Sequence, residues 1–464
     1  MVLSVRKSYK QKVKSADEVA KLVKSGMWID YGFGNDQPFL FDRVLAERAG
    51  ELQNVKIRCC LPLRPIQCLE KDHEGTTFWL GDWHQGSPSR KYVAQGRCNY
   101  IPMNFGEAPR YYREDVNVDI AVFTTTPMDS HGFFNFGTDI TYSKAAMEKA
   151  KIRVVEVNES KPWVQGGYDE CIHISEVDYI IENNEDKIVE YPTPEPTKVD
   201  EQIAENIAEL IPLDGPTLQV GIGALPNAIC KLLGEQGAKD IGIHTEMVTE
   251  AIVELVETGV LTCKKKSFLP GKIVHTFAFG SRKLYDWMDR NPMLAGYPVD
   301  FTNDPSIVAM NNNMITINSS LEIDLQGQVN SESIGTTQFT GTGGQLAFCR
   351  GGYYRTPKAL PPIGWSANKS FICMHSTYFD KASGQVKSKI VPTLSSGSIV
   401  TDPRTDVSYI ATEWGVAYLK GKSIPERVLE MVKIAHPDFR DWLIEEAMKI
   451  GWLPRTWAEK SFTA

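Results

Sequence analysis

The chain is organised around the stretch Asp240-Ile241-Gly242-Ile243-His244-Thr245-Glu246-Met247-Val248-Thr249-Glu250. Residues 241–244 predict a short buried strand, and the apolar residues of 249–258 recur at the spacing of one helix face. Glu246 is therefore expected at a strand-to-helix turn, where parallel α/β sheets commonly carry their functional groups. A carboxylate at this position is a nucleophile, a base or only a charge at the start of a helix.

The order of predicted elements around this stretch occurs twice. The series in the second half is a helix over 199–211, a strand over 217–220, the turn Gly221-Ile222-Gly223, a helix from Pro226 and the strand over 241–244. The series in the first half is a helix capped by Ser15, a strand over 27–31, the turn Gly32-Phe33-Gly34, a helix over 39–49 and a strand over 55–59. This repetition predicts an internal duplication. Strands alternating with helices in both halves predict an α/β protein of two similar, open, mainly parallel domains.

A linker is predicted between the two halves. Residues 182–186 are all acidic or amide residues, and residues 191–196 contain three alternating prolines. Proline stiffens the chain and removes backbone donors, which is typical of a connection between domains. We therefore expect an N-terminal domain over 1–196 and a C-terminal domain over 197–464.

Composition excludes several classes of protein. The chain has 464 residues, of which 42% are hydrophobic and 23% charged, and its formal net charge is −8. Such a length favours two domains. Apolar runs fall well short of the ~18 residues that span a bilayer, and the N-terminus lacks a signal-peptide core. We expect a soluble cytoplasmic protein that does not bind membranes, or nucleic acid, for which it lacks a broad basic stretch.

The cysteines and histidines predict neither a metal site nor a disulfide framework. Nine cysteines occur without CxxC spacing, and eight histidines occur without an HExxH motif. Cys59 and Cys60 align in the duplication with Thr245 and Glu246, but no partner base is evident near them. Glu246 is therefore the preferred strand-end nucleophile.

Two glycine-rich segments accompany Glu246 in the second half. Gly221-Ile222-Gly223-Ala224-Leu225-Pro226 opens a helix, whose free N–H groups can bind an anion. Pro226 replaces the third glycine of a dinucleotide motif, and a tight turn alone remains an alternative. Gly341-Thr342-Gly343-Gly344-Gln345 can aim backbone N–H groups at an oxyanion, although a flexible loop is the alternative. No GxSxG motif favours a serine hydrolase. These patterns alone leave a structural role for Glu246 open.

Several segments, taken together and in order, resemble class I coenzyme A-transferases of the acetyl-CoA hydrolase/transferase type, such as the butyryl-CoA:acetate and 4-hydroxybutyrate CoA-transferases. They include residues 221–228, 242–247, 317–328, 341–345, 412–417 and 434–440, and residues 106–113 and 131–137 extend the likeness into the first half. Ala347 stands where the family commonly has an acid before Phe348, and Pro361-Pro362 interrupts the following segment. These differences concern substrate preference and loop shape.

The resemblance implies a site between two similar α/β domains, with Glu246 as the catalytic glutamate. CoA would pass from a short-chain acyl-CoA such as butyryl-CoA to a carboxylic acid such as acetate, through a glutamyl-CoA thioester. No cofactor or metal is needed, because CoA is itself a substrate. Gly343 and Gly344 are the candidate oxyanion donors. The expected CoA-holding residues are Gly221, Ile222, Gly223, Ala224, Leu225, Asn318, Gly341 and Lys369.

The acyl side of the site is expected in the first half. Residues 32–38 and the loop 131–137 would form its walls, and Phe133, Phe134 and Phe136 would help to exclude water. A homo-oligomer is expected. Two alternatives remain: an acyl-CoA hydrolase of the same fold, in which water resolves the thioester, and a non-catalytic acyl-CoA-binding module, in which Glu246 only starts a helix.

Overall fold

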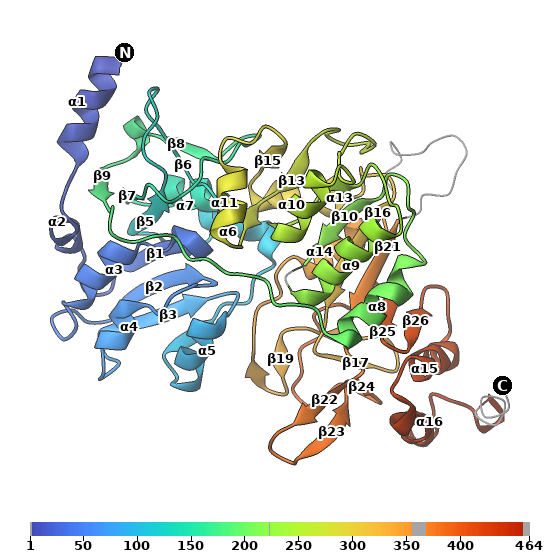
Figure 1. Cartoon of the computed structure of the whole chain (residues 1–464). Helices are drawn as coiled ribbons and strands as arrows, with labels where there is room; N and C mark the ends of the chain where they lie inside the picture. Colours follow the sequence, from blue (N-terminus) through green and yellow to red (C-terminus); the bar gives the residue numbers. More distant parts are fainter. Residues whose placement is uncertain (1, 222, 355–367, 458–464) are drawn as a thin grey trace. The chain divides into compact units, whose positions relative to one another are not determined.

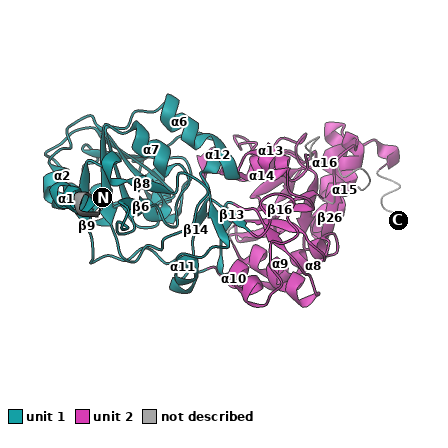
Figure 2. Ribbon diagram, turned by 90° about the horizontal axis from the view of Figure 1, so that it is seen from above, with its two compact units in different colours: residues 1–192, 246–250, 272–302 teal, residues 193–245, 251–271, 303–464 magenta. Residues whose placement is uncertain are grey.

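The computed structural model describes residues 2–221, 223–354 and 368–457. The chain forms two compact units, shown in different colours in Figure 2. The first contains Met1–Pro192, Glu246–Glu250 and Lys272–Thr302, and the second contains Thr193–Thr245, Ala251–Gly271 and Asn303–Ala464. The chain thus first changes unit inside the proline-rich segment 191–196, and two later segments belong to the first unit.

A seven-stranded sheet forms the centre of the first unit (Figure 1). Its order is β4-β3-β2-β1-β5-β7-β9, and every neighbouring pair is parallel. The strands are β1 (Trp28–Phe33), β2 (Val55–Cys60), β3 (Phe78–Asp82), β4 (Cys98–Tyr100), β5 (Ile120–Thr125), β7 (Ile152–Val157) and β9 (Tyr179–Glu182). Successive strand residues point to opposite faces. In β5, Ile120 and Val122 accordingly join one hydrophobic cluster, while Ala121 and Phe123 join another.

Helices bury both faces of this sheet, as parallel sheets require. Residues of α2 (Ala16–Ala20), α3 (Phe39–Ala46), α4 (Gln67–Lys71) and α5 (Ser87–Ala94) join the cluster of Ile120, and residues of α1 (Val2–Lys12), α6 (Ala108–Glu114) and α7 (Ser143–Lys149) join that of Phe123. Short 3-10 helices are η1 (Gly34–Asp36), η2 (Phe105–Glu107) and η3 (Ile174–Glu176), and β6 (Phe133–Asn135) pairs antiparallel with β8 (Cys171–His173). The predicted capping box of α2 is present: Glu18 N donates to Ser15 Oγ at 3.2 Å, and Ser15 N donates to the Glu18 carboxylate at 2.9 Å.

The two returning segments pack into the same core. They form β12 (Met247–Val248), β13 (Ile273–His275), β14 (Phe277–Ala278), α11 (Arg282–Met288), β15 (Leu294–Gly296) and α12 (Val299–Thr302). β12 pairs in parallel with β14, and β13 with β15. Met247, Phe277 and Phe279 lie in the hydrophobic cluster of Phe33. Burial of these apolar side chains explains why the segments belong to the first unit.

A six-stranded sheet forms the centre of the second unit, in the order β11-β10-β16-β21-β25-β26. Its strands are β10 (Thr217–Val220), β11 (Gly242–Ile243), β16 (Met314–Ser319), β21 (Lys369–Cys373), β25 (Tyr409–Thr412) and β26 (Gly415–Tyr418). All neighbours are parallel except β25 and β26. The helices described in this unit are α8 (Lys198–Ala208), α9 (Ala224–Glu235), α13 (Pro305–Val308), α14 (Gln345–Gly351), α15 (Ile424–Lys433) and α16 (Pro437–Ile450), together with α10 (Glu250–Glu257) after its first residue.

Small strands extend the second unit on one side of its sheet (Figure 1). β17 (Glu322–Asp324) lies between β18 (Val329–Asn330) and β24 (Ile390–Val391), and two antiparallel pairs join β19 (Ser333–Ile334) to β20 (Thr337–Gln338) and β22 (Thr377–Asp380) to β23 (Gln385–Ser388). Most residues of this unit's large cluster come from these strands, β25, β26, α15 and α16.

The predicted duplication is visible in the strand order. The run β2-β1-β5-β7-β9 of the first sheet matches the run β11-β10-β16-β21-β25 of the second. In both, the series helix, strand, helix, strand uses the same neighbours: α2, β1, α3, β2 and α8, β10, α9, β11. The prediction of two similar, mainly parallel α/β sheets is confirmed.

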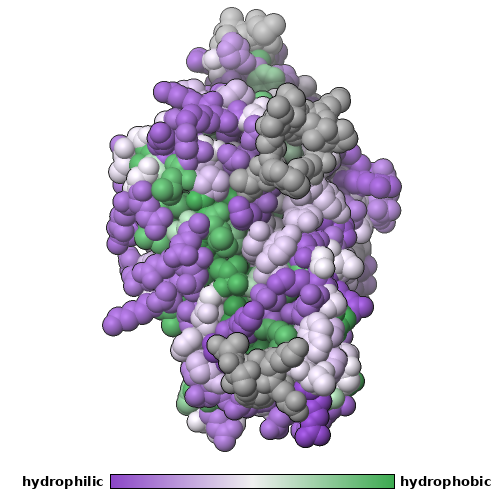
Figure 3. All heavy atoms as spheres, turned by 90° about the vertical axis from the view of Figure 1, so that its right-hand side faces the viewer, coloured by the Kyte–Doolittle hydropathy of each residue, from purple (hydrophilic) through white to green (hydrophobic). Residues whose placement is uncertain are grey.

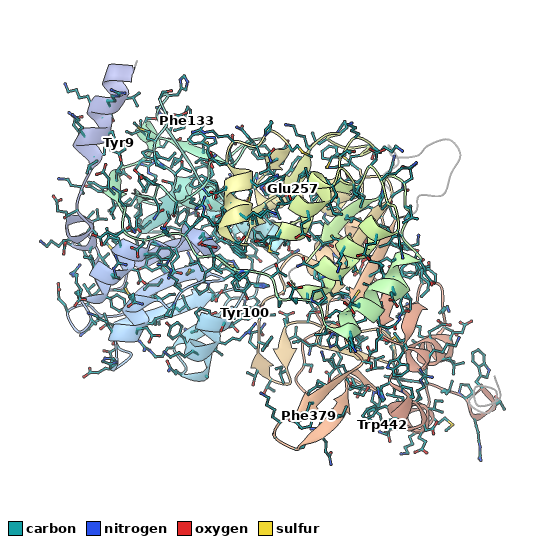
Figure 4. All side chains as sticks on the ribbon, viewed as in Figure 1. Tyr9, Tyr100, Phe133, Glu257, Phe379 and Trp442 are labelled. Atoms are coloured by element: carbon teal, nitrogen blue, oxygen red, sulfur yellow. The ribbon has the colours of Figure 1, made fainter. Side chains whose placement is uncertain are left out.

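Some hydrophobic side chains reach the surface. On the face that Figure 3 presents, hydrophobic groups gather near the middle, with hydrophilic groups on either side. Phe379 on β22 is 62% exposed and Trp442 on α16 is 39% exposed (Figure 4). In the part of the chain that the structure describes, no helix is both long and apolar enough to cross a membrane.

Candidate functional site

Glu246 lies where the chain passes from the second unit to the first. It follows β11 and Thr245, and its side chain is half-buried. Its carbonyl oxygen accepts hydrogen bonds from the N–H groups of Thr276 and Phe277, both at 3.0 Å. These two bonds fix the backbone of Glu246 from within the first unit.

The expected strand-to-helix turn at Glu246 is only partly correct. Met247 and Val248 form the short strand β12, because they pair with β14, and α10 begins at Glu250. The carboxylate of Glu250 accepts a hydrogen bond from Ser281 N, so this residue carries the charge at the helix start. Glu246 lies outside α10. The alternative that Glu246 only supplies the charge at the start of this helix therefore does not hold, because Glu250 occupies that position.

Thr245 joins the end of β11 to the end of β10. Its hydroxyl donates to Val220 O at 3.0 Å, and Val220 N donates to the same hydroxyl at 3.3 Å. Thr245 is fully buried, so water does not compete for these bonds. Because Val220 immediately precedes the 221–225 turn, the residue before Glu246 is held beside the first glycine segment.

The turn over 221–225 has the geometry of a helix start. Gly223 has a φ of +131°, which side-chain-bearing residues avoid, and it precedes the first residue of α9. A Cβ on Gly221 would lie 3.6 Å from Ile317 O, which places the turn beside β16. Ala224 is half-buried and Leu225 buried, while Ile222 is outside the described residues. The free N–H groups at the start of this 12-residue helix suit an anion.

Asn318 is held by a residue that sequence reasoning missed. Gln219, buried within β10, exchanges two amide hydrogen bonds with Asn318, of 3.1 and 3.2 Å. The same Gln219 oxygen accepts from Ile317 N at 3.1 Å. A polar glutamine between Leu218 and Val220 was the available signal, since buried amides need partners.

The second glycine segment reaches the same edge of the sheet. Gln345 donates to Ser331 Oγ at 2.8 Å, and Ser331 donates to Ser319 O, at the end of β16, at 3.2 Å. The carboxyl ends of parallel strands share one edge, so this segment lies at the edge where β10 and β11 also end.

Gly343 and Gly344 have successive backbone conformations of opposite hand. Gly343 has a φ of +58°, and Gly344 has a φ of −103° with a ψ of 9°. Such a pair turns consecutive N–H groups toward one point, an arrangement that binds anions. Gly341 is buried at the start of the segment.

Lys369 lies at a different place from the other candidates. It is the first residue of β21 and pairs with Ile315, whereas Asn318 pairs with Ile372. Three strand residues correspond to about 10 Å along the sheet. Burial lowers the pKa of Lys369. The structure therefore brings Gly221, Asn318 and the 341–345 segment to one edge and leaves Lys369 toward the opposite one.

The two cysteines that align with Thr245 and Glu246 are poorly suited to nucleophilic attack. Cys59 and Cys60 end β2 and are fully buried. Burial, more than the nearby carboxylates, raises the pKa of both thiols well above the ordinary value. Both therefore remain protonated near neutral pH.

The predicted aromatic walls of the first unit are largely core. Phe134 and Phe136 are 0% exposed, and Phe134 stacks on Tyr9 with ring centroids 6.3 Å apart. Phe133 alone is exposed, at the start of β6 (Figure 4). The expectation that all three rings shield a ligand is wrong for Phe134 and Phe136, because burying them in their own unit's core is more favourable.

The 32–38 segment encloses a buried charged group. Lys161 Nζ lies 2.6 Å from Asp36 Oδ1 and 3.8 Å from Asp139 Oδ2, and all three side chains are 0% exposed. Burial raises the pKa of Asp36 to about 6 against the opposing effect of Lys161. A Cβ on Gly34 would lie 2.5 Å from the Phe279 ring, so only glycine fits there.

Within residues 2–221, 223–354 and 368–457, no group of three histidine, cysteine, aspartate or glutamate side chains is arranged to hold a metal ion.

Two family domains, several related proteins and a solved structure are similar to this chain. Residues 3–190 match the acetyl-CoA hydrolase/transferase N-terminal domain, and residues 280–447 match the C-terminal domain of the same name. The butyryl-CoA:acetate CoA-transferase of Anaerostipes caccae is 41% identical over 449 residues, covering 96% of this chain and 98% of that protein. A probable butyrate:acetyl-CoA coenzyme A-transferase of Syntrophomonas wolfei is 43% identical over 97% of this chain and 98% of that protein. The crystal structure of RipA from Yersinia pestis aligns with a TM-score of 0.86 at 34% identity, covering 97% of this chain and 100% of that one.

Proposed function

The chain belongs to the acetyl-CoA hydrolase/transferase family, and on this premise we propose that it moves CoA from a short-chain acyl-CoA, such as butyryl-CoA, to a carboxylic acid, such as acetate. It is a CoA-transferase, since relatives with this activity match it over nearly its whole length. The observation that carries the mechanism is the position of Glu246, outside the helix and next to Thr245, which is bonded to the end of β10.

Glu246 is the proposed nucleophile. Its carboxylate adds to the thioester carbonyl of the acyl-CoA, the C–S bond breaks, and a mixed anhydride and CoA thiolate form. The thiolate then adds to the glutamyl carbonyl and releases the first carboxylic acid, which leaves a glutamyl-CoA thioester. The acceptor acid reverses the two steps and regenerates the Glu246 carboxylate. The energy of the thioester is retained throughout, so no other energy source is required.

Each addition gives a tetrahedral oxyanion, which backbone donors can stabilise. The proposed donors are the N–H groups of Gly343 and Gly344. Their opposite-handed conformations support this role, since consecutive amides of such a pair converge on one anion.

CoA is the proposed ligand of the remaining candidates. The start of α9 suits a phosphate group of CoA, because a helix N-terminus favours negative charge. Asn318, fixed by Gln219, offers an amide beside that turn. The proposed CoA-holding residues are Gly221, Ile222, Gly223, Ala224, Leu225, Asn318, Gly341 and Lys369. Of these, Lys369 has the weakest support, because it starts its strand at the other end of the sheet.

The test is a covalent adduct on Glu246. Incubation with butyryl-CoA alone, followed by tryptic digestion, should add a CoA-sized mass to the peptide of residues 240–264. This peptide also contains Cys263, so fragment ions must place the adduct on Glu246 and distinguish the thioester from a mixed disulfide. Glu246→Ala should abolish the adduct and reduce transfer to below about one thousandth. Glu254→Ala, an exposed acid on the same peptide, should retain both. An adduct confined to another residue refutes the mechanism.

Hydrolysis and simple binding are separated by kinetics. A transferase of this mechanism gives parallel double-reciprocal lines when acyl-CoA and acetate are varied. An acceptor acid bound next to the glutamyl-CoA thioester has an effective concentration of about 10⁵ M in favourable cases. Water has no such advantage in a site from which it is excluded, so transfer should be faster than hydrolysis. Release of CoA at the full rate without any acceptor acid would identify a hydrolase, and full activity of Glu246→Ala would leave only a binding role for this site.

Three further expectations belong to the proposal. They are a cytoplasmic location, a homo-oligomer, and a division into domains over 1–196 and 197–464. Light scattering after size-exclusion chromatography measures the oligomeric state directly.

A further inference from the structure

Two buried carboxylates lie beside the second glycine segment, residues 341–345, and have no part in the mechanism above. Glu332 follows β18 and is 4% exposed, and Asp402 precedes β25 and is 0% exposed. Both belong to the second unit, as does the whole of the 341–345 segment. A buried carboxylate is expensive unless hydrogen bonds compensate its desolvation, so its partners indicate what it holds in place.

Glu332 binds the chain on both sides of Gly341. The hydroxyl of Thr342 donates to Glu332 Oε2 at 3.1 Å, and the amide of Gln338 donates to the same oxygen at 3.3 Å. The main-chain oxygen of Glu332 also accepts from the N–H groups of Phe339 and Thr340, at 2.8 and 3.1 Å. One residue therefore fixes four points in the approach to Gly343.

The Glu332 carboxylate is itself held in place by other residues of the second unit. The hydroxyl of Thr401 donates to Glu332 Oε1 at 3.1 Å, and Ser331 N donates to that hydroxyl at 2.9 Å. Val329 and Asp402 form an isolated antiparallel bridge, which joins the strand before Glu332 to the segment of Thr401. The carboxylate is thus attached to the framework of the unit and not only to the loop.

Asp402 holds the other end of the glycine segment. Its Oδ2 accepts from Gln345 Nε2 at 2.5 Å, and the same Gln345 group contacts Ser331. Gln345 directly follows Gly344. The two N–H groups proposed as oxyanion donors therefore lie between a point bonded to Glu332 and a point bonded to Asp402.

We propose that Glu332 is a positioning residue for CoA transfer, which, with Asp402, holds Gly343 and Gly344 in the conformation that aims their N–H groups at the oxyanion. The inference rests on the proposed role of these two glycines. Glycine has no side chain to restrict its backbone, so consecutive glycines keep one conformation only when neighbouring residues impose it. Bonds on both sides of the pair supply that restriction. A shift of about 1 Å in a catalytic group is enough to lower a rate about 100-fold.

Three variants test the role of Glu332. Glu332→Ala should lower kcat by about 100-fold while the KM for butyryl-CoA changes less than about threefold, since the donors act on the transition state. Glu332→Gln retains one acceptor oxygen and should recover most of the loss. Glu322→Ala is the matched control: Glu322 accepts hydrogen bonds from Ser395 and Ser398 in the same unit but does not contact the glycine segment, so kcat should be unchanged.

The readouts separate this inference from the proposed function. Formation of the Glu246 adduct by the wild-type enzyme tests the function, and the rate of that formation in the Glu332 variants tests the inference. An unchanged kcat in Glu332→Ala, or a raised KM with an unchanged kcat, overturns it. If Glu332→Ala does not fold, Thr342→Val decides, because it removes one hydroxyl bond to Glu332. This variant should lower kcat about tenfold with the KM retained, and wild-type kcat would overturn the inference.

Discussion

Replacement of Lys161 by methionine tests the buried charged group of the first unit. Lys161 Nζ donates to Asp36 Oδ1 at 2.6 Å, to Thr124 O at 2.8 Å and to Asn35 O at 3.3 Å. Methionine has a similar length but carries no charge and no donor. The substitution therefore leaves Asp36 without its cation and leaves two buried carbonyl groups without this donor.

The expected loss of stability has two parts. The unpaired buried carbonyl groups contribute about 2 kcal/mol, since each lost partner costs about 1–3 kcal/mol and structural relaxation recovers some of it. Loss of the cation raises the pKa of Asp36 above its present value of about 6. The folded variant must then keep Asp36 protonated at a cost of about 1.4 kcal/mol for each pH unit above 6. The sum at pH 7 is about 3–4 kcal/mol, within the range of about 3–5 kcal/mol for breaking buried ion pairs.

The second part has a definite sign with pH. A carboxyl whose folded pKa is raised contributes stability at low pH, which is lost as the pH rises through that pKa. Near pH 5, Asp36 is mostly protonated in both proteins, so only the carbonyl part remains. Near pH 8, the protonation part adds about 3 kcal/mol. The difference in stability between wild type and variant should therefore grow from pH 5 to pH 8.

Urea unfolding followed by circular dichroism at both pH values measures this difference. Lys151→Met is the matched control, because Lys151 is 75% exposed and its ion pair with Asp119 lies on the surface of the same unit. That variant should lose less than about 1 kcal/mol at either pH. A loss below about 1 kcal/mol for Lys161→Met, or a larger loss at pH 5 than at pH 8, would contradict a stabilising role for this buried ion pair.

Two other predictions concern the second unit. Gly343→Ala should cost about 1–2 kcal/mol of stability, because its φ is +58°, and should lower kcat at least tenfold. Gly384→Ala is the control, since Gly384 has a φ of +68° with open space around it, and this variant should show the same strain with unchanged kcat. Equal activity of the two variants would contradict a catalytic role for Gly343. Burial raises the pKa of Asp402 from 3.8 to about 7 against its hydrogen bond from Gln345 and the charge of Arg350. Asp402→Asn should therefore gain stability relative to wild type as the pH rises from 4 to 7, by up to about 4 kcal/mol in urea unfolding, and a pH-independent difference would show that Asp402 does not titrate there.

Much of the fold could be predicted from the sequence because its signals are local. Hydrophobic periodicity and turn residues placed β10 at 217–220, as observed. The repeated order of helix, strand, glycine turn, helix and strand predicted two similar sheets, and the matching strand orders confirm them. Each of these helices, strands and turns is specified by residues close to one another in the sequence.

Only some residues of the candidate site could be identified from the sequence. The family motifs and the predicted strand end identify Glu246 from the sequence, and the two glycine segments are visible as runs of glycine. Gln219, Thr245, Glu332 and Asp402 were not identified, because each acts through a partner remote in the sequence. The bond from Gln345 to Asp402, for example, spans 57 positions. No local pattern marks such a pair.

The class of fold, the duplication and the position of the candidate nucleophile along the chain therefore follow from the amino-acid sequence. The three-dimensional structure was needed to show that Met247 and Val248 form a strand, since pairing with β14 replaces the helical turn that local propensity allows. It also decided that Phe134 and Phe136 belong to a core and not to a shield, and that Lys369 starts its strand away from Asn318. The reason is that long-range pairing and burial compete with local preference, and their outcome depends on which distant residues meet.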